Sequence, residues 1–314
     1  MRVVFFGTPD IAAFVLRHLQ AQGVEVVAVV SKPDKPKGRS MKLQPTPVRV
    51  AAEELNLPLL QPEKASDPQF IEALKELKPD LFAVVAYGEI VKQAVLDIPA
   101  VAAINMHASL LPEYRGAAPM QRALLDGKEE TGVTIMHMVR KMDAGPIIAQ
   151  EKIPVPSDMN LGQLEKVMGE VGAKLLADVI KQFEMGAPAS SEQEESSATL
   201  APKIEGAECR LDFSKSAACL HNLIRALSPE PGAFFFAQIR GEQFVVKVYR
   251  SAVIKEEGEP GTVVLPGKGR VLIRCGRNTL EILELQTAGR KRLPAKEWVS
   301  GLMGGSFEII SDAL

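Results

Sequence analysis

The sequence predicts an α/β domain with a mostly parallel sheet, followed by a smaller β-barrel domain. Apolar runs alternate with helical patterns through residues 2–185, a segment rich in Ser, Glu and Ala follows, and short apolar runs then succeed one another closely. The chain has 314 residues, of which 46% are hydrophobic and 24% charged, as in a globular protein with room for two cores.

The first elements have the order of a βαβ unit. Residues 2–6 form an apolar run, residues 10–20 a helical pattern and residues 24–30 a second apolar run. This order predicts two parallel strands joined by a right-handed crossover, as in Rossmann-like domains. Only Gly7 stands in the first turn, where nicotinamide binding requires Gly-x-Gly-x-x-Gly, so a dehydrogenase is disfavoured.

A long basic loop at residues 31–47 interrupts the α/β alternation. Only Asp34 opposes its cations, which are Lys32, Lys35, Lys37, Arg39 and Lys42. The loop is either a solvated connection or an arm that binds RNA phosphates, and composition does not choose between them.

Helical patterns at residues 48–55 and 67–77 precede a fully apolar strand at 81–86. Tyr87 stands at the carboxyl end of this strand. Its ring suits either the edge of the core or the wall of a ligand site, and we favour the core.

The central stretch of the chain combines an amide, an imidazole and, further on, a carboxylate. Residues 101–104 predict a short strand, so Asn105 and His107 share one face at its carboxyl end, where open α/β sheets bind ligands. Asn105 can donate to a developing oxyanion, the imidazole of His107 can act as an acid or a base, and Asp143 can orient that imidazole. These groups suit acyl transfer by direct attack of a substrate amine. Alternatively, the Asn-x-His pair is a turn with an incidental histidine.

The remaining elements complete two predicted domains, 1–189 and 207–314, with a linker at 190–206. The first domain continues with strands at 131–139 and 147–153 and a helix at 161–185 that Asn160 caps. His137 is expected to be structural. The second domain begins with a helix at 217–227, and its short strands are predicted at 233–239, 243–253, 261–265, 270–275 and 279–286.

Three motifs together resemble the formyltransferases that use 10-formyltetrahydrofolate. The motifs are Asn105-Met106-His107 with the loop at 109–112, Arg115 to Pro119, and Met142 to Gly145. The resemblance covers nearly the whole chain, and within this superfamily the chain is similar to the enzymes that act on initiator methionyl-tRNA. It implies a catalytic domain followed by an OB-like barrel that binds tRNA, with formyl transfer to the methionine α-amine as the activity.

The resemblance also implies roles for individual residues. The implied catalytic residues are Asn105, His107 and Asp143. The implied folate-binding residues are Ser109, Leu110, Leu111, Pro112 and Tyr87. An insertion at the basic loop is implied to engage the tRNA acceptor end through Arg39, Lys42 and Lys37. From their charge alone, Arg290 and Lys291 are further candidates for tRNA contact, although they also suit a solvated turn.

Net charge, hydropathy and cysteine content limit the possible partners, location and metal content of the protein. The net charge of −2 hides an uneven distribution, since residues 207–314 carry 15 basic against 12 acidic side chains. We expect no membrane span, metal or disulfide, because no long apolar run occurs and the three cysteines lack metal-ligand spacing. Residues 1–7 lack the features of a signal peptide, so we expect a cytoplasmic protein, and we expect it to be a monomer. Rival functions are another folate-dependent formyltransferase or hydrolase, and an RNA-binding module without catalysis.

Overall fold

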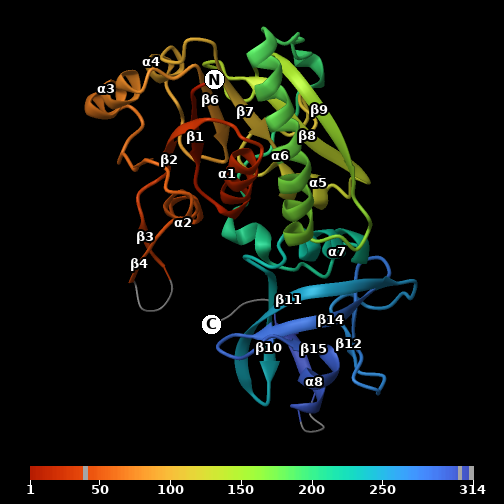
Figure 1. Ribbon diagram of the computed structural model, residues 1–314. Helices are drawn as coiled ribbons and strands as arrows, with labels where there is room; N and C mark the ends of the chain where they lie inside the picture. Colours follow the sequence, from red (N-terminus) through yellow and green to blue (C-terminus); the bar gives the residue numbers. More distant parts are fainter. Residues whose placement is uncertain (38–41, 303–305, 311–314) are drawn as a thin grey trace. The chain divides into compact units, whose positions relative to one another are not determined.

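The computed structural model describes residues 1–37, 42–302 and 306–310, and the chain divides into two compact units (Figure 1). The first unit comprises Met1–Pro119, Glu130–Pro154 and Glu165–Ala201. The second comprises Met120–Glu129, Val155–Leu164 and Pro202–Leu314. We retain 1–189 and 207–314 as proposed domains, since each range contains one of the two large sheets.

Within the described residues, the first unit contains a seven-stranded sheet that is mostly parallel, as the alternating pattern predicts. The five strands from β5 to β7 run parallel, and β8 and β9 continue the sheet antiparallel. In spatial order the strands are β5 (Leu59–Leu60), β2 (Val26–Val30), β1 (Val3–Gly7), β6 (Leu81–Val85), β7 (Ala102–His107), β8 (Glu130–His137) and β9 (Ile147–Pro154).

Helices cover both faces of this sheet because its central strands are apolar on both sides. Helices α3 and α4 share a buried cluster with alternate residues of β1 and β6, and α6 packs on the opposite face against Met106 of β7. The helices of this part of the chain are α1 (Asp10–Ala21), α2 (Pro47–Glu54), α3 (Pro68–Glu76), α4 (Gln93–Leu96), α5 (Pro119–Leu125) and α6 (Leu161–Met185).

The order of strands reverses between β1 and β6. From β1 the chain builds outward through β2 and β5, and it then returns to place β6 and β7 on the other side of β1. Such a reversal is where open α/β sheets bind ligands, at the carboxyl ends of the strands. A hydrogen bond joins the loops that follow β1 and β6, since the Thr8 hydroxyl donates to the Tyr87 carbonyl at 2.8 Å.

The basic loop contains a short antiparallel hairpin formed by β3 (Lys35–Lys37) and β4 (Lys42–Gln44). Side chains fasten its base. The hydroxyls of Ser31 and Thr46 lie 2.7 Å apart, and Arg49 of α2 forms an ion pair with Asp34 at 2.5 Å.

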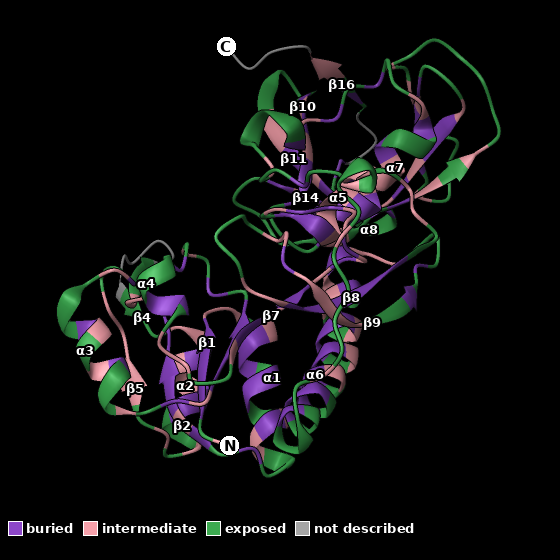
Figure 2. Cartoon of the chain, turned by 90° about the horizontal axis from the view of Figure 1, so that it is seen from above, coloured by how far each residue is buried: buried purple, intermediate pink, exposed green. Residues whose placement is uncertain are grey.

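In the second unit the antiparallel strands curl into a nearly closed barrel, as the short apolar runs predict. A buried cluster of alternate strand residues with α7 and Trp298 fills it. Figure 2 shows the buried stretches of β11 and β14 in purple. Its elements are α7 (Ala217–Ala226), β10 (Ala233–Ile239), β11 (Glu242–Ile254), β12 (Val263–Val264), β13 (Val271–Arg274), β14 (Thr279–Thr287), β15 (Leu293–Pro294), α8 (Ala295–Ser300) and β16 (Phe307–Ile310).

A buried arginine explains why two segments from earlier in the sequence pack with the second unit. Arg225 of α7 is only 5% exposed, and burial lowers its pKa. Its guanidinium donates to the carbonyls of Leu124 at 3.3 Å and of Pro156 and Met159 at 3.4 Å. A buried cation requires such acceptors, so α7 holds both segments.

Within residues 1–37, 42–302 and 306–310, none of the helices has both the length and the apolar composition that crossing a bilayer requires. The same ranges contain no group of three or more His, Cys, Asp or Glu residues placed to hold a metal ion.

Candidate active site

Strand β7 places two of the predicted catalytic side chains side by side. The strand extends through His107, further than the predicted end at residue 104, because Asn105 and His107 pair with Met136 and Thr134 of β8. Asn105 and His107 share the face of β7 opposite Met106, which packs on α6. Within the described part of the chain, the side-chain amide of Asn105 has no hydrogen-bond partner, so this amide is available to a ligand.

Both ring nitrogens of His107 face oxygen atoms. Its Nε2 lies 2.9 Å from the carbonyl oxygen of Tyr114, and Nδ1 lies 3.7 Å from Oδ2 of Asp143. A carbonyl can only accept a hydrogen bond, so Nε2 carries a hydrogen and donates it. Nδ1 is therefore the nitrogen that remains for chemistry, beside a carboxylate. The two side chains are only 7% and 13% exposed, which limits screening by water.

Asp143 is held in a turn that brings it back to His107 from 36 residues along the chain. Its backbone has φ of +52°, and its Oδ2 accepts from the Gly116 amide at 2.9 Å. Gly145 follows, where a Cβ atom would lie 1.9 Å from the His137 carbonyl oxygen. Only glycine allows this approach, so the turn requires a glycine at position 145.

The loop at 109–112 is fixed by buried hydrogen bonds. Thr134 of β8 donates to the Ser109 carbonyl at 2.7 Å and accepts from the Leu111 amide at 3.1 Å, and Gln150 donates to the Leu111 carbonyl at 2.9 Å. Ser109 is itself fully buried and donates to the Glu113 carbonyl at 2.6 Å. Its hydroxyl is therefore engaged within the loop, whereas Leu110 and Pro112 are half-buried and present an apolar edge.

Tyr87 belongs to the hydrophobic core, as we predicted from the sequence. Its side chain is 2% exposed, within the cluster that also contains Phe6, and the two rings meet edge to face with centroids 5.5 Å apart. Among the described residues its hydroxyl has no hydrogen-bond partner. Burial, with a smaller effect of the Glu89 carboxylate, raises the pKa of Tyr87 to about 12.

Two polar residues that the sequence did not single out as site residues connect the loops of the site. Gln193 donates from Nε2 to the carbonyl oxygens of Asp143 and Gly145, at 2.9 and 2.8 Å. Its Oε1 accepts from Nε and Nη2 of Arg115, at 3.0 and 2.8 Å. Gln193 lies in the segment that composition predicts to be a linker, where no local pattern indicates such a contact.

The predicted tRNA-binding residues are placed only in part. Arg39 lies outside the described residues, and so do the side chains of Lys37 and Lys42, whose backbones pair across the hairpin. Arg290 and Lys291 are exposed in the turn between β14 and β15.

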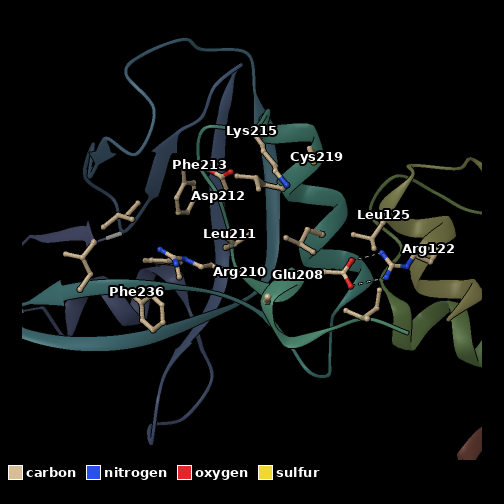
Figure 3. Close-up of a pocket in the computed structure, with 17 residues that line it drawn as sticks. Arg122, Leu125, Glu208, Arg210, Leu211, Asp212, Phe213, Lys215, Cys219 and Phe236 are labelled. Atoms are coloured by element: carbon tan, nitrogen blue, oxygen red, sulfur yellow. Dashed lines mark hydrogen bonds and ion pairs between the residues drawn. The ribbon is translucent and has the colours of Figure 1, made fainter. Parts of the chain in front are cut away.

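The second unit contains a pocket of about 670 Å³, shown in Figure 3, and none of the predicted catalytic residues lines it. Arg210 stacks over the Phe236 ring at 5.3 Å, and Arg122 pairs with Glu208 at 2.7 Å. Hydrogen bonds from Arg122, followed by that from the Glu205 backbone, lower the pKa of Glu208 to about 2. The lining combines apolar side chains with ion-paired groups.

Comparison with known proteins identifies the two parts of the chain. Residues 1–180 match the formyl transferase family, and residues 203–303 match the formyl transferase C-terminal domain. The methionyl-tRNA formyltransferase of Protochlamydia amoebophila is 49% identical over 311 residues, which are 99% of this chain and 98% of that protein. The methionyl-tRNA formyltransferase of Bacillus subtilis is 40% identical over 301 residues, 96% of this chain and 94% of that protein.

Solved structures share the fold at lower identity. The sugar 3N-formyl transferase WlaRD, crystallised with dTDP and 5-N-formyl-THF, superimposes with a TM-score of 0.67 at 18% identity, covering 93% of this chain and 99% of that one. HypX from Aquifex aeolicus, in complex with tetrahydrofolic acid, gives a TM-score of 0.66 at 18% identity and covers 97% of this chain but 48% of that one.

Proposed function

Because the chain belongs to the methionyl-tRNA formyltransferase family, we propose that it moves the formyl group of 10-formyltetrahydrofolate onto the α-amine of methionine esterified to initiator tRNA. The product is N-formylmethionyl-tRNA, which serves translation initiation. The reaction takes place in the cytoplasm on a monomeric enzyme. The observation that carries this proposal is the cluster of Asn105, His107 and Asp143 at the carboxyl end of β7, with Nδ1 of His107 3.7 Å from the Asp143 carboxylate.

The folate supplies an acyl carbon already activated toward amines. As the methionine nitrogen bonds to this carbon, the carbonyl oxygen gains negative charge. Asn105 donates to this oxygen from its unengaged amide, and protonated His107 donates from Nδ1. The carbon's bond to the folate nitrogen then breaks. The amine loses one proton and the folate nitrogen gains one, so the overall transfer is balanced.

Asp143 balances the positive charge that His107 carries when both ring nitrogens are protonated. Tyr114 holds Nε2 through its carbonyl, so the ring cannot turn away from the carboxylate without losing that hydrogen bond. His107 therefore enters the reaction already oriented, and such preorganised donors are usually the largest single contribution to catalysis of this kind.

The residues of the 109–112 loop fit a folate ring in part. Leu110 and Pro112 offer a half-buried apolar edge, and the loop backbone is fixed by Thr134 and Gln150, so the edge is rigid. The hydroxyls of Ser109 and Tyr87 are buried, and the Ser109 hydroxyl is occupied within the loop. We assign the recognition of the ring to Leu110 and Pro112, and a supporting role to Leu111, Ser109 and Tyr87, whose side chains are buried.

The tRNA is bound by cations on both predicted domains. Lys37, Arg39 and Lys42 of the basic loop contact phosphates near the acceptor end, and Arg290 and Lys291 contact phosphates from the barrel. Lysine and arginine supply the electrostatic part of nucleic-acid affinity, which a small-molecule formyltransferase has little use for.

The test is an assay of formyl transfer from 10-formyltetrahydrofolate to four acceptors: charged initiator tRNA, charged elongator methionyl-tRNA, uncharged tRNA and free methionine. Product with charged initiator tRNA alone, lost in His107→Ala, is the expected result. Equal formylation of the elongator tRNA would remove the initiator preference. Formate release or formylation of free methionine, without tRNA product, would overturn the proposed substrate while keeping the folate site.

A further inference from the structure

Residues 190–201 form a strap across the first unit, although their composition is that of a linker. One end pairs with β9, where the backbones of Ser191 and Ile147 exchange two hydrogen bonds of 2.7 and 2.9 Å. The other end pairs with the loop after β7, where the Arg115 amide donates to Thr199 at 2.9 Å and the Ala201 amide donates to Arg115 at 2.7 Å. The strap therefore joins the two loops that carry the site.

Gln193 lies between these two anchored ends and uses both polar atoms of its amide. The nitrogen donates to two carbonyls of the Asp143 turn, one of them that of Asp143 itself. The oxygen accepts two hydrogen bonds from Arg115. A carboxylate in this position could not make the first pair of contacts, because it has no hydrogen to donate.

Arg115 is fixed in turn. It is 5% exposed, and its Nη1 donates to Glu195 at 2.9 Å, while Lys141 pairs with the other oxygen of Glu195 at 2.7 Å. The hydrogen bonds from Lys141 and Arg115 lower the pKa of Glu195, and the bond from Lys141 has the larger effect. The chain of contacts runs from one side of the Asp143 turn, through the strap, to the loop after β7.

We propose that Gln193, held by Arg115, is a positioning residue that sets the Asp143 carboxylate against His107. This inference rests on the catalytic roles proposed above for His107 and Asp143. The link is direct, because Arg115 precedes Gly116, whose amide donates to the Asp143 carboxylate. Gln193 therefore fixes the backbone of Asp143 to the same loop segment that binds its side chain.

The Gly116 amide holds the Asp143 side chain and the His137 amide donates to the Pro146 carbonyl at 2.9 Å, but the backbone of the turn itself is closed weakly. Residue 143 has a positive φ, and the backbone hydrogen bond that closes the turn, from Ala144 to Lys141, is long at 3.3 Å. Without the Gln193 amide, two carbonyls lose their donor and the turn can relax by a few tenths of an ångström. Errors of this kind in a reacting group cost rate and leave binding unaffected.

The test compares Gln193→Met with Gln193→Glu and a matched control. Met keeps the length of the side chain but makes neither pair of contacts, and Glu keeps only the pairing with Arg115. We expect both to lower kcat about tenfold, with KM for tRNA and for folate changed less than about twofold. Ser196→Ala removes a hydrogen bond to Glu194 within the same strap and should leave kcat unchanged.

A double-mutant cycle with Asp143→Asn separates positioning from general loss of structure. If Gln193 acts through Asp143, Gln193→Met should cost about tenfold in the wild type and less than about twofold in Asp143→Asn.

Two results would overturn this positioning role. One is an equal loss in both backgrounds of the cycle, and the other is full kcat in both Gln193 variants. If Gln193→Met does not fold, Gln193→Glu in the same cycle decides between these outcomes. If His107→Ala is inactive and the Gln193 variants are fully active, only the positioning role of Gln193 is refuted. If His107→Ala is active, the mechanism proposed above is refuted as well.

Discussion

Two loops of the first unit follow the carboxyl ends of parallel strands, yet they are held in different ways. The loop after β7 is tied along its length, with His107, Ser109 and Leu111 each hydrogen-bonded to buried groups. The hairpin after β2 is fastened at its base by the Ser31 to Thr46 contact and the Asp34 to Arg49 ion pair, and its tip lies outside the described residues.

The difference follows from what each loop is proposed to do. A donor to a transition-state oxygen must be placed within a fraction of an ångström before the substrate arrives, so its loop is fixed by short, buried hydrogen bonds. A lysine that attracts phosphates acts over several ångströms through water, so its loop requires only a fixed base. Catalytic variants should therefore change kcat, and hairpin variants should change KM.

The largest expected effect is that of Asn105→Ala. The variant removes the side-chain amide that we propose donates to the oxyanion of the transition state, so kcat should fall about a hundredfold or more while KM for tRNA changes little. Steady-state formylation of charged tRNA measures both constants. Turnover near that of the wild type would show that the oxyanion is bound by other groups.

Removing three charges of the basic loop should have the next largest effect, and this effect should fall on KM and not on kcat. In the triple variant Lys37→Ser, Arg39→Ser, Lys42→Ser we expect KM for tRNA to rise about tenfold with kcat unchanged, and the salt dependence of binding to become shallower. A control variant replaces three exposed cations elsewhere in the first unit, Lys75, Lys152 and Lys166, with serine. Equal effects in the two triple variants would show that only net charge matters.

Asp34→Ala should have a smaller effect of the same kind. It removes the acceptor shared by Arg49 and Gln61 and loosens the hairpin base, so KM for tRNA should rise about threefold. The pair is partly exposed, so stability should fall by less than about 1 kcal/mol. Glu53→Ala is the matched control, because it removes the other partner of Arg49 without touching the hairpin. Unchanged tRNA binding in Asp34→Ala would mean that the base does not position the arm.

Tyr87→Phe should have the smallest effect on activity and a measurable one on stability. Removing a buried hydroxyl with no described partner should add about 1 kcal/mol to the free energy of unfolding and leave KM for folate unchanged. A rise in that KM would show instead that the hydroxyl contacts folate.

The same substitution should change how stability depends on alkaline pH. The pKa of the Tyr87 phenol rises from 10.0 in the unfolded chain to about 12 in the folded one. Between these values the unfolded state holds fewer protons, so wild-type stability falls as pH rises. Tyr87→Phe lacks this component, and denaturant unfolding between pH 9 and 11 measures the difference. Parallel losses in the two proteins would contradict the assignment.

Much of the fold was predictable because it depends on short-range patterns. The helix at 161–185 and the strand at 233–239 match the predicted ranges, and Asn160 caps the helix by accepting from Gln163 at 3.0 Å. The end of β7 was predicted too early, because Asn105 and His107 are polar. Their place in the strand comes from pairing with β8, which periodicity does not reveal.

The sequence by itself determined the two sheets, the family and the grouping of Asn105, His107 and Asp143 as candidates, because alternation and motif spacing are local properties. Tertiary structure decided what each polar group contacts. It directed Nε2 of His107 to the Tyr114 carbonyl, buried Tyr87, and brought Gln193 to Arg115 across 78 residues. Such contacts depend on how the loops approach one another in space, and no local pattern encodes that approach.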